Sequence, residues 1–119
     1  MKEAKILVVD DEQNLRLLIS EELEELGYKV ETVSNAEEAL KRIESDDFDL
    51  ATIDIEMPGM NGIELAGILR QKYPALRIIL LTAYSHYKYD LASWAADAYV
   101  VKSTDLTELK ETVKKLLQM

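Results

Sequence analysis

Cysteine is absent from this sequence of 119 residues, which excludes disulfide bonds and thiolate metal sites. The absence is typical of a reducing compartment, and we expect a cytoplasmic protein. Long apolar runs are lacking too, since no stretch reaches the roughly eighteen apolar residues of a membrane-spanning helix. Residues 1–3 lead directly into a strand-like run, so we expect no signal peptide. Two prolines and four glycines leave no linker or low-complexity stretch, and we expect one domain over residues 1–119.

Basic residues are outnumbered, at 14 against 23 acidic residues, which gives a formal net charge of −9. A field of that sign repels nucleic acid, so we expect no direct nucleic-acid contact. Apolar residues still make up 48% of the chain and charged residues 31%, a balance typical of a packed globular fold. We therefore interpret most of the acidic surface as solubilising.

Short apolar runs give the first indication of the fold. Four of them are nearly continuous and too short for helices, as in strands buried on both faces of a sheet. They cover residues 6–9, 50–53, 78–81 and 98–101. A fifth segment, residues 28–33, alternates apolar and polar positions and carries more charge, so we expect it at a sheet edge.

Between these runs, apolar residues recur every three or four positions, which is the spacing of amphipathic helices. The expected helices cover residues 15–26, 36–43, 63–69 and 106–117, with a fifth over 86–96 that lacks a clear cap. Three of them have a candidate N-cap residue followed three positions later by an acid. These pairs are Asn35 and Glu38, Asn61 and Glu64, and Asp105 and Glu108.

Strand and helix thus alternate five times, which predicts an α/β fold with a parallel sheet between two helical layers. Right-handed crossovers and the charged edge segment favour the strand order 2-1-3-4-5 of a flavodoxin-like (βα)5 fold. In such sheets, ligands bind beyond the carboxyl ends of the strands, where the strand order reverses. The residues that follow each buried run are therefore the candidates for function.

Polar residues occupy these positions. The four buried runs are followed, in chain order, by Asp10, Asp11 and Glu12, by Asp54, by Thr82, and by Lys102. Taken singly, each has a structural explanation: an acid such as Asp11 caps a helix, a threonine bonds local backbone, and a lysine is solvated. Taken together, carboxylates at one edge repel each other, and a hard dication such as Mg²⁺ resolves that repulsion. A lysine beside them attracts an anion, so the set indicates phosphoryl transfer.

Four stretches also carry a resemblance to a known family. They are Val-Val-Asp-Asp-Glu at 8–12, Asp-Ile-Glu-Met-Pro-Gly-Met-Asn-Gly at 54–62, Leu-Thr-Ala at 81–83 and Asp-Ala-Tyr-Val-Val-Lys at 97–102. With them, the sequence closely resembles the receiver domains of two-component response regulators from about Lys5 to Leu117. The resemblance implies a signalling domain that accepts a phosphoryl group and slowly loses it, and not a turnover enzyme.

The resemblance also implies roles for particular residues. Asp54 is implied to be the phosphoacceptor, which attacks a phosphoryl group on a histidine of a sensor histidine kinase or histidine phosphotransfer protein. Mg²⁺ (or Mn²⁺) is implied to be bound directly by Asp11, Asp54 and the backbone carbonyl of Glu56, and through water by Asp10. Lys102 is implied to contact a phosphoryl oxygen.

A conformational switch is implied by the same resemblance. Thr82 donates its hydroxyl to another phosphoryl oxygen, and Tyr99 rotates into the space that Thr82 leaves. A ligand shifts such an equilibrium only through its differential affinity, so we expect a pre-existing active population. The face formed by residues 86–96, 98–101 and 106–117 is then expected to bind an output partner or a second copy. Aromatic residues near it either pack on the sheet or anchor that partner: Tyr84, Tyr87, Tyr89 and Trp94.

The sequence departs from the family pattern after the last strand. Ser103 follows Lys102 where the family usually has a proline with a cis bond. A non-proline cis bond costs about 2.5–4 kcal/mol, so we predict a trans Lys102–Ser103 peptide. Ala95 stands where glycine is common, and the stretch before it is slightly short, which favours a short or mobile helix over 86–96.

Three further points concern residues close to the expected site. Glu56 and Tyr84 flank it, and an acid at position 56 either guides or blocks water, so the direction of its effect on the acyl phosphate is open. His86 has no second ligand nearby and is not expected to bind metal.

Two other functions share parts of this pattern. A haloacid-dehalogenase-like phosphohydrolase also combines an aspartate nucleophile, a threonine, a lysine and Mg²⁺, but it has an Asp-x-Asp pattern after the first strand. Here Asp10 and Asp11 are adjacent. A flavodoxin-like binding module shares the layout, but the acids at 10–12 would repel a phosphate group in the absence of metal.

Overall fold

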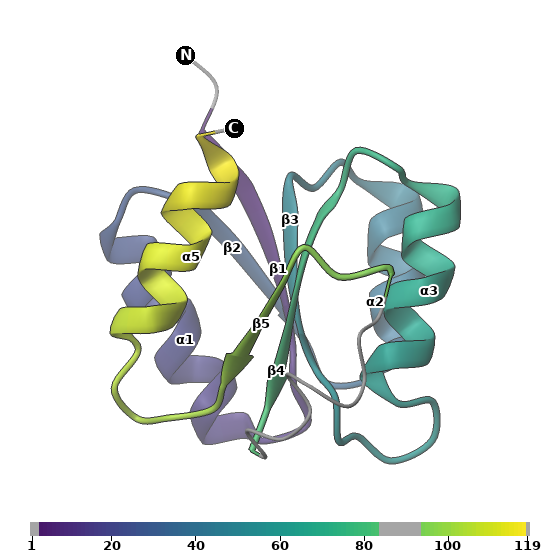
Figure 1. The fold of residues 1–119 in the computed structure, drawn as a ribbon, viewed down its shortest axis with the longest axis horizontal. Helices are drawn as coiled ribbons and strands as arrows, with labels where there is room; N and C mark the ends of the chain where they lie inside the picture. The colour runs from purple at the N-terminus through teal and green to yellow at the C-terminus, as the bar shows by residue number, and fades with distance from the viewer. Residues whose placement is uncertain (1–2, 84–93, 119) are drawn as a thin grey trace.

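Five parallel strands form a sheet in the structure, a computed structural model that describes residues 3–83 and 94–118 (Figure 1). The strand order is β2-β1-β3-β4-β5, which confirms the predicted order and the edge position of β2. The strands are β1 (Lys5–Val9), β2 (Lys29–Val33), β3 (Leu50–Asp54), β4 (Arg77–Thr82) and β5 (Ala98–Val101). Over the two described ranges, no helix is long and apolar enough to cross a membrane.

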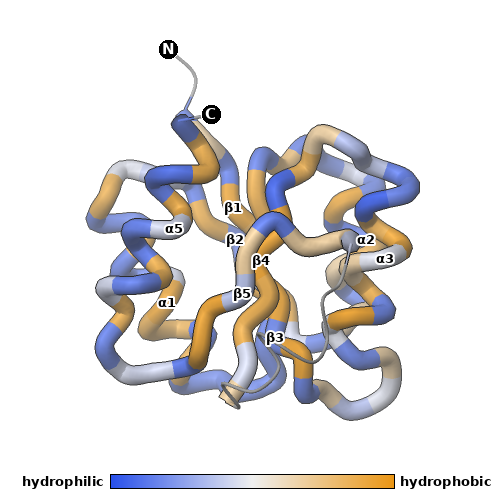
Figure 2. Tube along the Cα trace, in the orientation of Figure 1, coloured by the Kyte–Doolittle hydropathy of each residue, from blue (hydrophilic) through white to orange (hydrophobic). Residues whose placement is uncertain are grey.

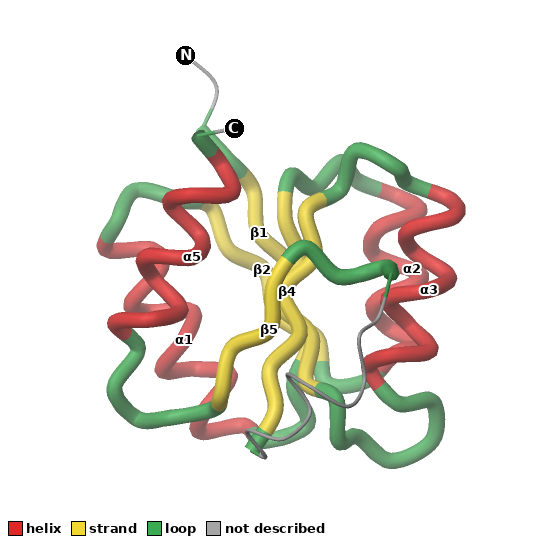
Figure 3. The backbone as a smooth tube through the Cα atoms, in the orientation of Figure 1, coloured by secondary structure: helices red, strands yellow, loops and turns green. Residues whose placement is uncertain are grey.

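Helices cover both faces of this sheet (Figure 3). One face carries α1 (Gln13–Glu25) and α5 (Thr107–Leu117), and the other carries α2 (Ala36–Ser45) and α3 (Gly62–Lys72). The flavodoxin-like α/β prediction is therefore confirmed. The helix expected over 86–96 falls mainly outside the described residues, and its last three residues, 94–96, are not helical.

The central strands are apolar along their length, as the orange colour of the tube in Figure 2 shows. Successive side chains of a strand point to opposite faces of the sheet and pack into two separate hydrophobic cores. Ile6 and Val8 of β1 belong to the core under α1 and α5, whereas Leu7 and Val9 belong to the core under α2 and α3. All four are fully buried, which explains why the strands appear in the sequence as continuous apolar runs.

Two of the helix N-termini have the predicted caps. The Asn35 side chain accepts a hydrogen bond from the Glu38 N–H at 2.8 Å. Asn61 and Glu64 form a complete capping box, in which each side chain accepts from the other residue's N–H. A cap of this kind stabilises a helix by about 1 kcal/mol, so these pairs fix where α2 and α3 begin.

The third cap prediction is wrong, and the alternative role of Asp11 as a helix cap is not observed either. Leu106, and not Asp105, is the N-cap residue of α5. The Asp105 carboxylate instead accepts from both the N–H and the hydroxyl of Thr107, a local turn that leaves it outside the helix. Glu12 is the N-cap residue of α1, so Asp11 does not cap that helix.

Arg70, near the end of α3, holds together segments that precede β4 and β5. Its guanidinium donates to the carbonyls of Leu76 at 2.8 Å and Ala95 at 3.0 Å, and to the Asp97 carboxylate at 2.7 Å. Asp97 also accepts from the Ile78 N–H at 2.7 Å. One arginine therefore fixes the start of β5 against the start of β4.

Arg70→Ala is expected to lower the free energy of unfolding by about 2–3 kcal/mol, because it removes hydrogen bonds to two partly buried carbonyls and the ion pair with Asp97. Urea unfolding followed by circular dichroism measures the change. Lys41→Ala is the control, since it removes only an exposed pair with Glu37 at 3.7 Å and should change stability by less than about 0.5 kcal/mol. Equal losses in the two variants would contradict this role for Arg70.

Candidate functional site

Carboxylate, hydroxyl and ammonium groups meet at the carboxyl edge of the sheet, as the sequence predicts. Asp10 follows β1, Asp54 ends β3 and Thr82 ends β4, and all three are fully buried. Lys102 directly follows β5, and its side chain is only 13% exposed. Asp11 is exposed beside them. The sheet edge therefore combines buried charges with one acid that solvent can reach.

The three aspartates suit a divalent cation. One carboxylate oxygen from each of Asp10, Asp11 and Asp54 lies within 4.8 Å of the others. The Oδ2 atoms of Asp10 and Asp54 are buried and accept no hydrogen bond from the described residues, although both form an ion pair with the single ammonium group of Lys102. Buried oxygens of this kind are unfavourable unless a cation balances them, and Mg²⁺ prefers carboxylate ligands. This donor set therefore fits Mg²⁺.

Lys102 brings a positive charge into the cluster. Its Nζ lies 3.0 Å from Asp54 Oδ2, 3.4 Å from Asp10 Oδ2 and 3.4 Å from Glu12 Oε1. Burial lowers the pKa of Lys102, but its contacts with Asp54 and Asp10 outweigh burial and raise the pKa overall. Lys102 therefore remains protonated at neutral pH and attracts anions to this edge.

Burial acts in the opposite direction on the acids. Removal from water raises the pKa of Asp54 to about 7, although Lys102 offsets part of the effect. Burial also raises the pKa of Asp10, against a lowering by the hydrogen bond from the Glu12 N–H. The lysine alone thus does not stabilise both charged carboxylates, whereas a bound dication favours the charged form of each.

Glu56 connects Asp54 with the end of β4. Its main-chain N–H donates to Asp54 Oδ1 at 3.2 Å. Its side chain reaches the end of β4, where Oε2 accepts from the Thr82 hydroxyl at 3.1 Å and Oε1 accepts from the Ala83 N–H at 3.4 Å. The sequence places Glu56 beside the site but does not reveal these contacts, because they join residues 26 and 27 positions apart.

Gly62 belongs to the site, although sequence reasoning used it only as part of a motif. It is the first residue of α3, and a Cβ added there would lie 2.2 Å from the carbonyl oxygen of Asp54. Its N–H donates to the Ile55 carbonyl at 2.9 Å. The start of α3 therefore rests directly on the backbone that carries Asp54. A glycine at the first position of a well-capped helix was the available signal.

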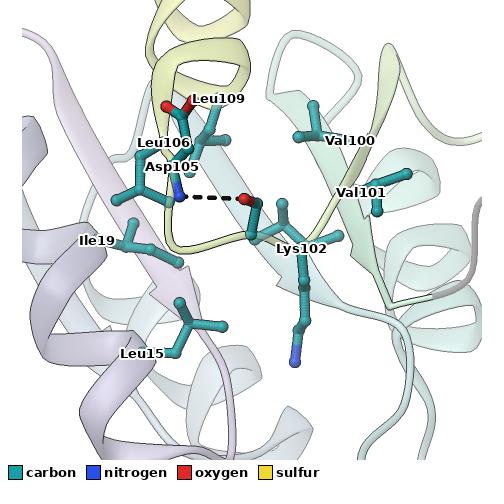
Figure 4. Close-up of a pocket in the computed structure, with 10 residues that line it drawn as sticks. Leu15, Ile19, Val100, Val101, Lys102, Asp105, Leu106 and Leu109 are labelled. Atoms are coloured by element: carbon teal, nitrogen blue, oxygen red, sulfur yellow. Dashed lines mark hydrogen bonds between the residues drawn. The ribbon is translucent and has the colours of Figure 1, made fainter.

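The loop after β5 has the predicted backbone, with a trans Lys102–Ser103 peptide. The Ser103 Oγ accepts from the Asp105 N–H at 3.0 Å, which is the dashed line in Figure 4. Apolar side chains of α1 and α5 line a small cavity behind this loop, and the Lys102 side chain extends away from Leu106 and Leu109 (Figure 4). Serine in place of proline thus leaves Lys102 directed at the acids.

The aromatic residues of the expected partner face are only partly described. Tyr84, Tyr87 and Tyr89 lie outside the described residues, as does His86, and the expectations for them stay predictions. Trp94 is 68% exposed and does not pack on the sheet. Tyr99 is partly buried and packs against the core under α2 and α3.

A family model for the response regulator receiver domain matches residues 6–114. The chain belongs to this family. The match fits the site, because the receiver motif residues at the ends of β1, β3, β4 and β5 are those that converge at its carboxyl edge. It does not favour the haloacid-dehalogenase or flavodoxin alternatives.

Solved receiver domains are close to this one in sequence and in structure. TrrA of Thermotoga maritima, in complex with Mg²⁺–BeF, is 60% identical, with a TM-score of 0.90 over 95% of this chain and 98% of TrrA. TrrA in complex with the histidine kinase ThkA gives a TM-score of 0.88 over 96% and 98% of the two chains. The two-component response regulator PhoP of Pseudomonas aeruginosa is 40% identical over 96% of this chain and 52% of its own length. This receiver domain thus spans about half the length of that curated relative.

Proposed function

We propose that residues 1–119 form a phosphoacceptor receiver domain, in which a phosphoryl group passes from a partner phosphohistidine to Asp54 with the help of Mg²⁺. The observation that supports this most directly is the buried Asp54 carboxylate, 3.0 Å from the Lys102 ammonium and beside two further aspartates. That arrangement attracts a dication and an anion to the same point. TrrA, bound to Mg²⁺–BeF in one structure and to a histidine kinase in another, supports the same reading.

The metal ligands are assigned from the acids that converge. Asp11, Asp54 and the backbone carbonyl of Glu56 would hold Mg²⁺ (or Mn²⁺) directly, and Asp10 would hold it through water. When bound, the ion neutralises negative charge on the transferring phosphoryl oxygens. Because Asp11 is the exposed member of the set, it is the ligand that meets an incoming ion first.

The transfer itself needs positioning more than covalent machinery. An Asp54 oxygen attacks phosphorus, the P–N bond to the donor imidazole breaks, and its electron pair stays on the imidazole. Lys102 contacts one phosphoryl oxygen and stabilises its charge. The domain is modified in this step and loses the group slowly by hydrolysis, so it is not a turnover enzyme.

Thr82 and Tyr99 are the residues proposed to respond. Side chains alternate along β4, so Thr82 points to the same face as Leu80, and Leu80 is the partner of Tyr99 in the register of β4 with β5. Thr82 and Tyr99 are therefore diagonal neighbours on the α2 and α3 side. A phosphoryl group adds about −1.5 to −2 charge and attracts the Thr82 hydroxyl, after which Tyr99 fills the vacated space.

The partners proposed are a sensor histidine kinase or histidine phosphotransfer protein as donor, and an output partner or second copy on the face of residues 86–96, β5 and α5. Exposed Trp94 supports the second assignment, since exposed aromatic residues anchor protein partners. The net charge of −9 argues against direct nucleic-acid contact.

Incubation with Mg²⁺ and acetyl phosphate is expected to add one phosphoryl group, visible as a labile gain in intact mass. Asp54→Asn should abolish the gain, because an amide is not a nucleophile for phosphorus, and chelation of Mg²⁺ should suppress it in the unmodified protein. Hydrolysis of a phosphate monoester with turnover would instead favour a phosphohydrolase. A mass gain that survives Asp54→Asn would overturn the assignment of the phosphoacceptor.

A further inference from the structure

We propose that the Glu56 carboxylate is a latch, which holds the Thr82 hydroxyl in the unphosphorylated state and must release it before Thr82 reaches a phosphoryl group. The inference rests on the proposed function, which places that group on Asp54. It makes Glu56 a positioning residue that controls when the Thr82 hydroxyl becomes available.

The contacts of Glu56 place it between the two residues that it would couple. Its N–H donates to Asp54 Oδ1 at 3.2 Å, so the main chain of Glu56 stays next to the phosphoacceptor. Its carboxylate accepts from the Thr82 hydroxyl at 3.1 Å and from the Ala83 N–H at 3.4 Å. Two donors from the end of β4, one side chain and one backbone, thus converge on a single carboxylate. The Glu56 carboxylate therefore restrains both the Thr82 side chain and the backbone at the end of β4.

The Thr82 hydroxyl can donate a hydrogen bond either to Glu56 or to a phosphoryl group on Asp54, but not to both. A hydroxyl has one proton to donate. While that proton points to Glu56, it does not reach an oxygen of a phosphoryl group on Asp54. Hydrogen bonds to charged acceptors are stronger than those to neutral ones, so the resting contact opposes the movement.

Electrostatics then explain how the latch opens. A phosphoryl group on Asp54 brings about −1.5 to −2 charge to a residue two positions from Glu56. Like charges repel, so the phosphoryl group makes the position of the Glu56 carboxylate less favourable. The same group also competes with Glu56 as an acceptor for the Thr82 hydroxyl. Both effects favour transfer of the hydrogen bond from Glu56 to the phosphoryl group.

Glu56→Gln tests the latch, because it keeps the shape of the side chain and removes its charge. With beryllium fluoride and Mg²⁺ as the phosphoryl mimic, the variant is expected to bind about three- to tenfold more tightly than the unmodified protein, since a charged acceptor is worth more than a neutral one. Amide NMR titration measures the affinity. It also follows the Ala83 N–H, whose resonance should shift in the variant and, in the unmodified protein, on addition of the mimic.

Two further variants separate the latch from a general charge effect. Thr82→Val removes the hydroxyl, and in that background Glu56→Gln should tighten binding clearly less, because only the direct repulsion between Glu56 and the mimic is then relieved. Glu37→Gln removes one exposed negative charge on α2 and should leave the affinity unchanged. Tightening by Glu56→Gln that is undiminished in Thr82→Val, or equal tightening by Glu37→Gln, overturns the latch.

The same titrations distinguish failure of the latch from failure of the proposed function. If the unmodified protein binds the mimic and Glu56→Gln binds it equally well, the latch alone is wrong. If the unmodified protein does not bind the mimic in the presence of Mg²⁺, the proposed function is wrong and the latch falls with it.

Discussion

Gly62→Ala is expected to destabilise the protein by about 3 kcal/mol, a large effect for the addition of one methyl group. The added Cβ would lie 2.2 Å from the Asp54 carbonyl oxygen and 2.9 Å from the Ile55 Cα, and both are backbone atoms that cannot rotate away. Either α3 or the end of β3 must move. Because β3 carries Asp54, Mg²⁺ affinity is also expected to fall by about tenfold, as when a residue that supports metal ligands is altered. Urea unfolding and a Mg²⁺ titration measure the two effects.

Gly67→Ala is the matched control within the same helix. Nothing lies within 4 Å of a Cβ added at Gly67, so alanine there should gain about 0.5–1 kcal/mol through its higher helix propensity. The two substitutions are chemically identical and opposite in expected sign. Similar effects at both positions would show that close approach to Asp54 does not constrain Gly62.

Asp54→Asn is expected to stabilise the metal-free protein at high pH and to have little effect near pH 4. Burial raises the pKa of Asp54 from 3.8 to about 7 in the folded state, so the folded state binds more protons than the unfolded state between these values. Stability of the unmodified protein therefore falls as pH rises through this window. This shift in the pKa of Asp54 corresponds to a loss of at most about 4 kcal/mol in the free energy of unfolding above pH 7. Asparagine does not ionise, so the variant avoids that loss. Unfolding in chelator from pH 4 to pH 8 measures the difference.

Asp105→Asn provides a control of opposite sign. Hydrogen bonds from the hydroxyl and N–H of Thr107 lower the pKa of Asp105, so its carboxylate stabilises the fold above its unfolded pKa and loses this effect as pH falls. Removing that charge should destabilise the protein at neutral pH.

Addition of Mg²⁺ should stabilise the unmodified protein and not Asp54→Asn. A stability difference for Asp54→Asn that does not vary with pH would contradict the shifted pKa.

The fold could be predicted because its determinants are local and repeated. Buried strands on both faces give continuous apolar runs, and Asn61 with Glu64 marks the start of a helix within four residues. The candidate site followed from one rule, that strands of a parallel sheet end at a common edge. Asp54 and Lys102 needed no further information to be placed together.

Contacts that join distant segments could not be predicted in the same way. The hydrogen bond from Thr82 to Glu56 and the contacts of Arg70 with Ala95 and Asp97 depend on side-chain directions that the sequence does not encode locally. Asp105 was misplaced for a related reason, since its side chain has two ways to satisfy nearby backbone groups. In the structure the Asp105 carboxylate bonds Thr107, and Leu106 is the N-cap residue of α5.

Alternation along the strands gives the two sides of the sheet different tasks. By alternation, Asp54 shares a face of the sheet with Leu50, and Lys102 shares it with Val100, both of which pack under α1 and α5. Thr82 shares the opposite face with Leu80, which packs with Tyr99 under α2 and α3. The sheet thus separates the residues that capture the phosphoryl group, on one side, from the residues that respond to it, on the other. Substitutions on the side of α1 and α5 are therefore expected to alter capture of the phosphoryl group, and those on the side of α2 and α3 to alter the response, while Glu56 and Thr82 connect the two.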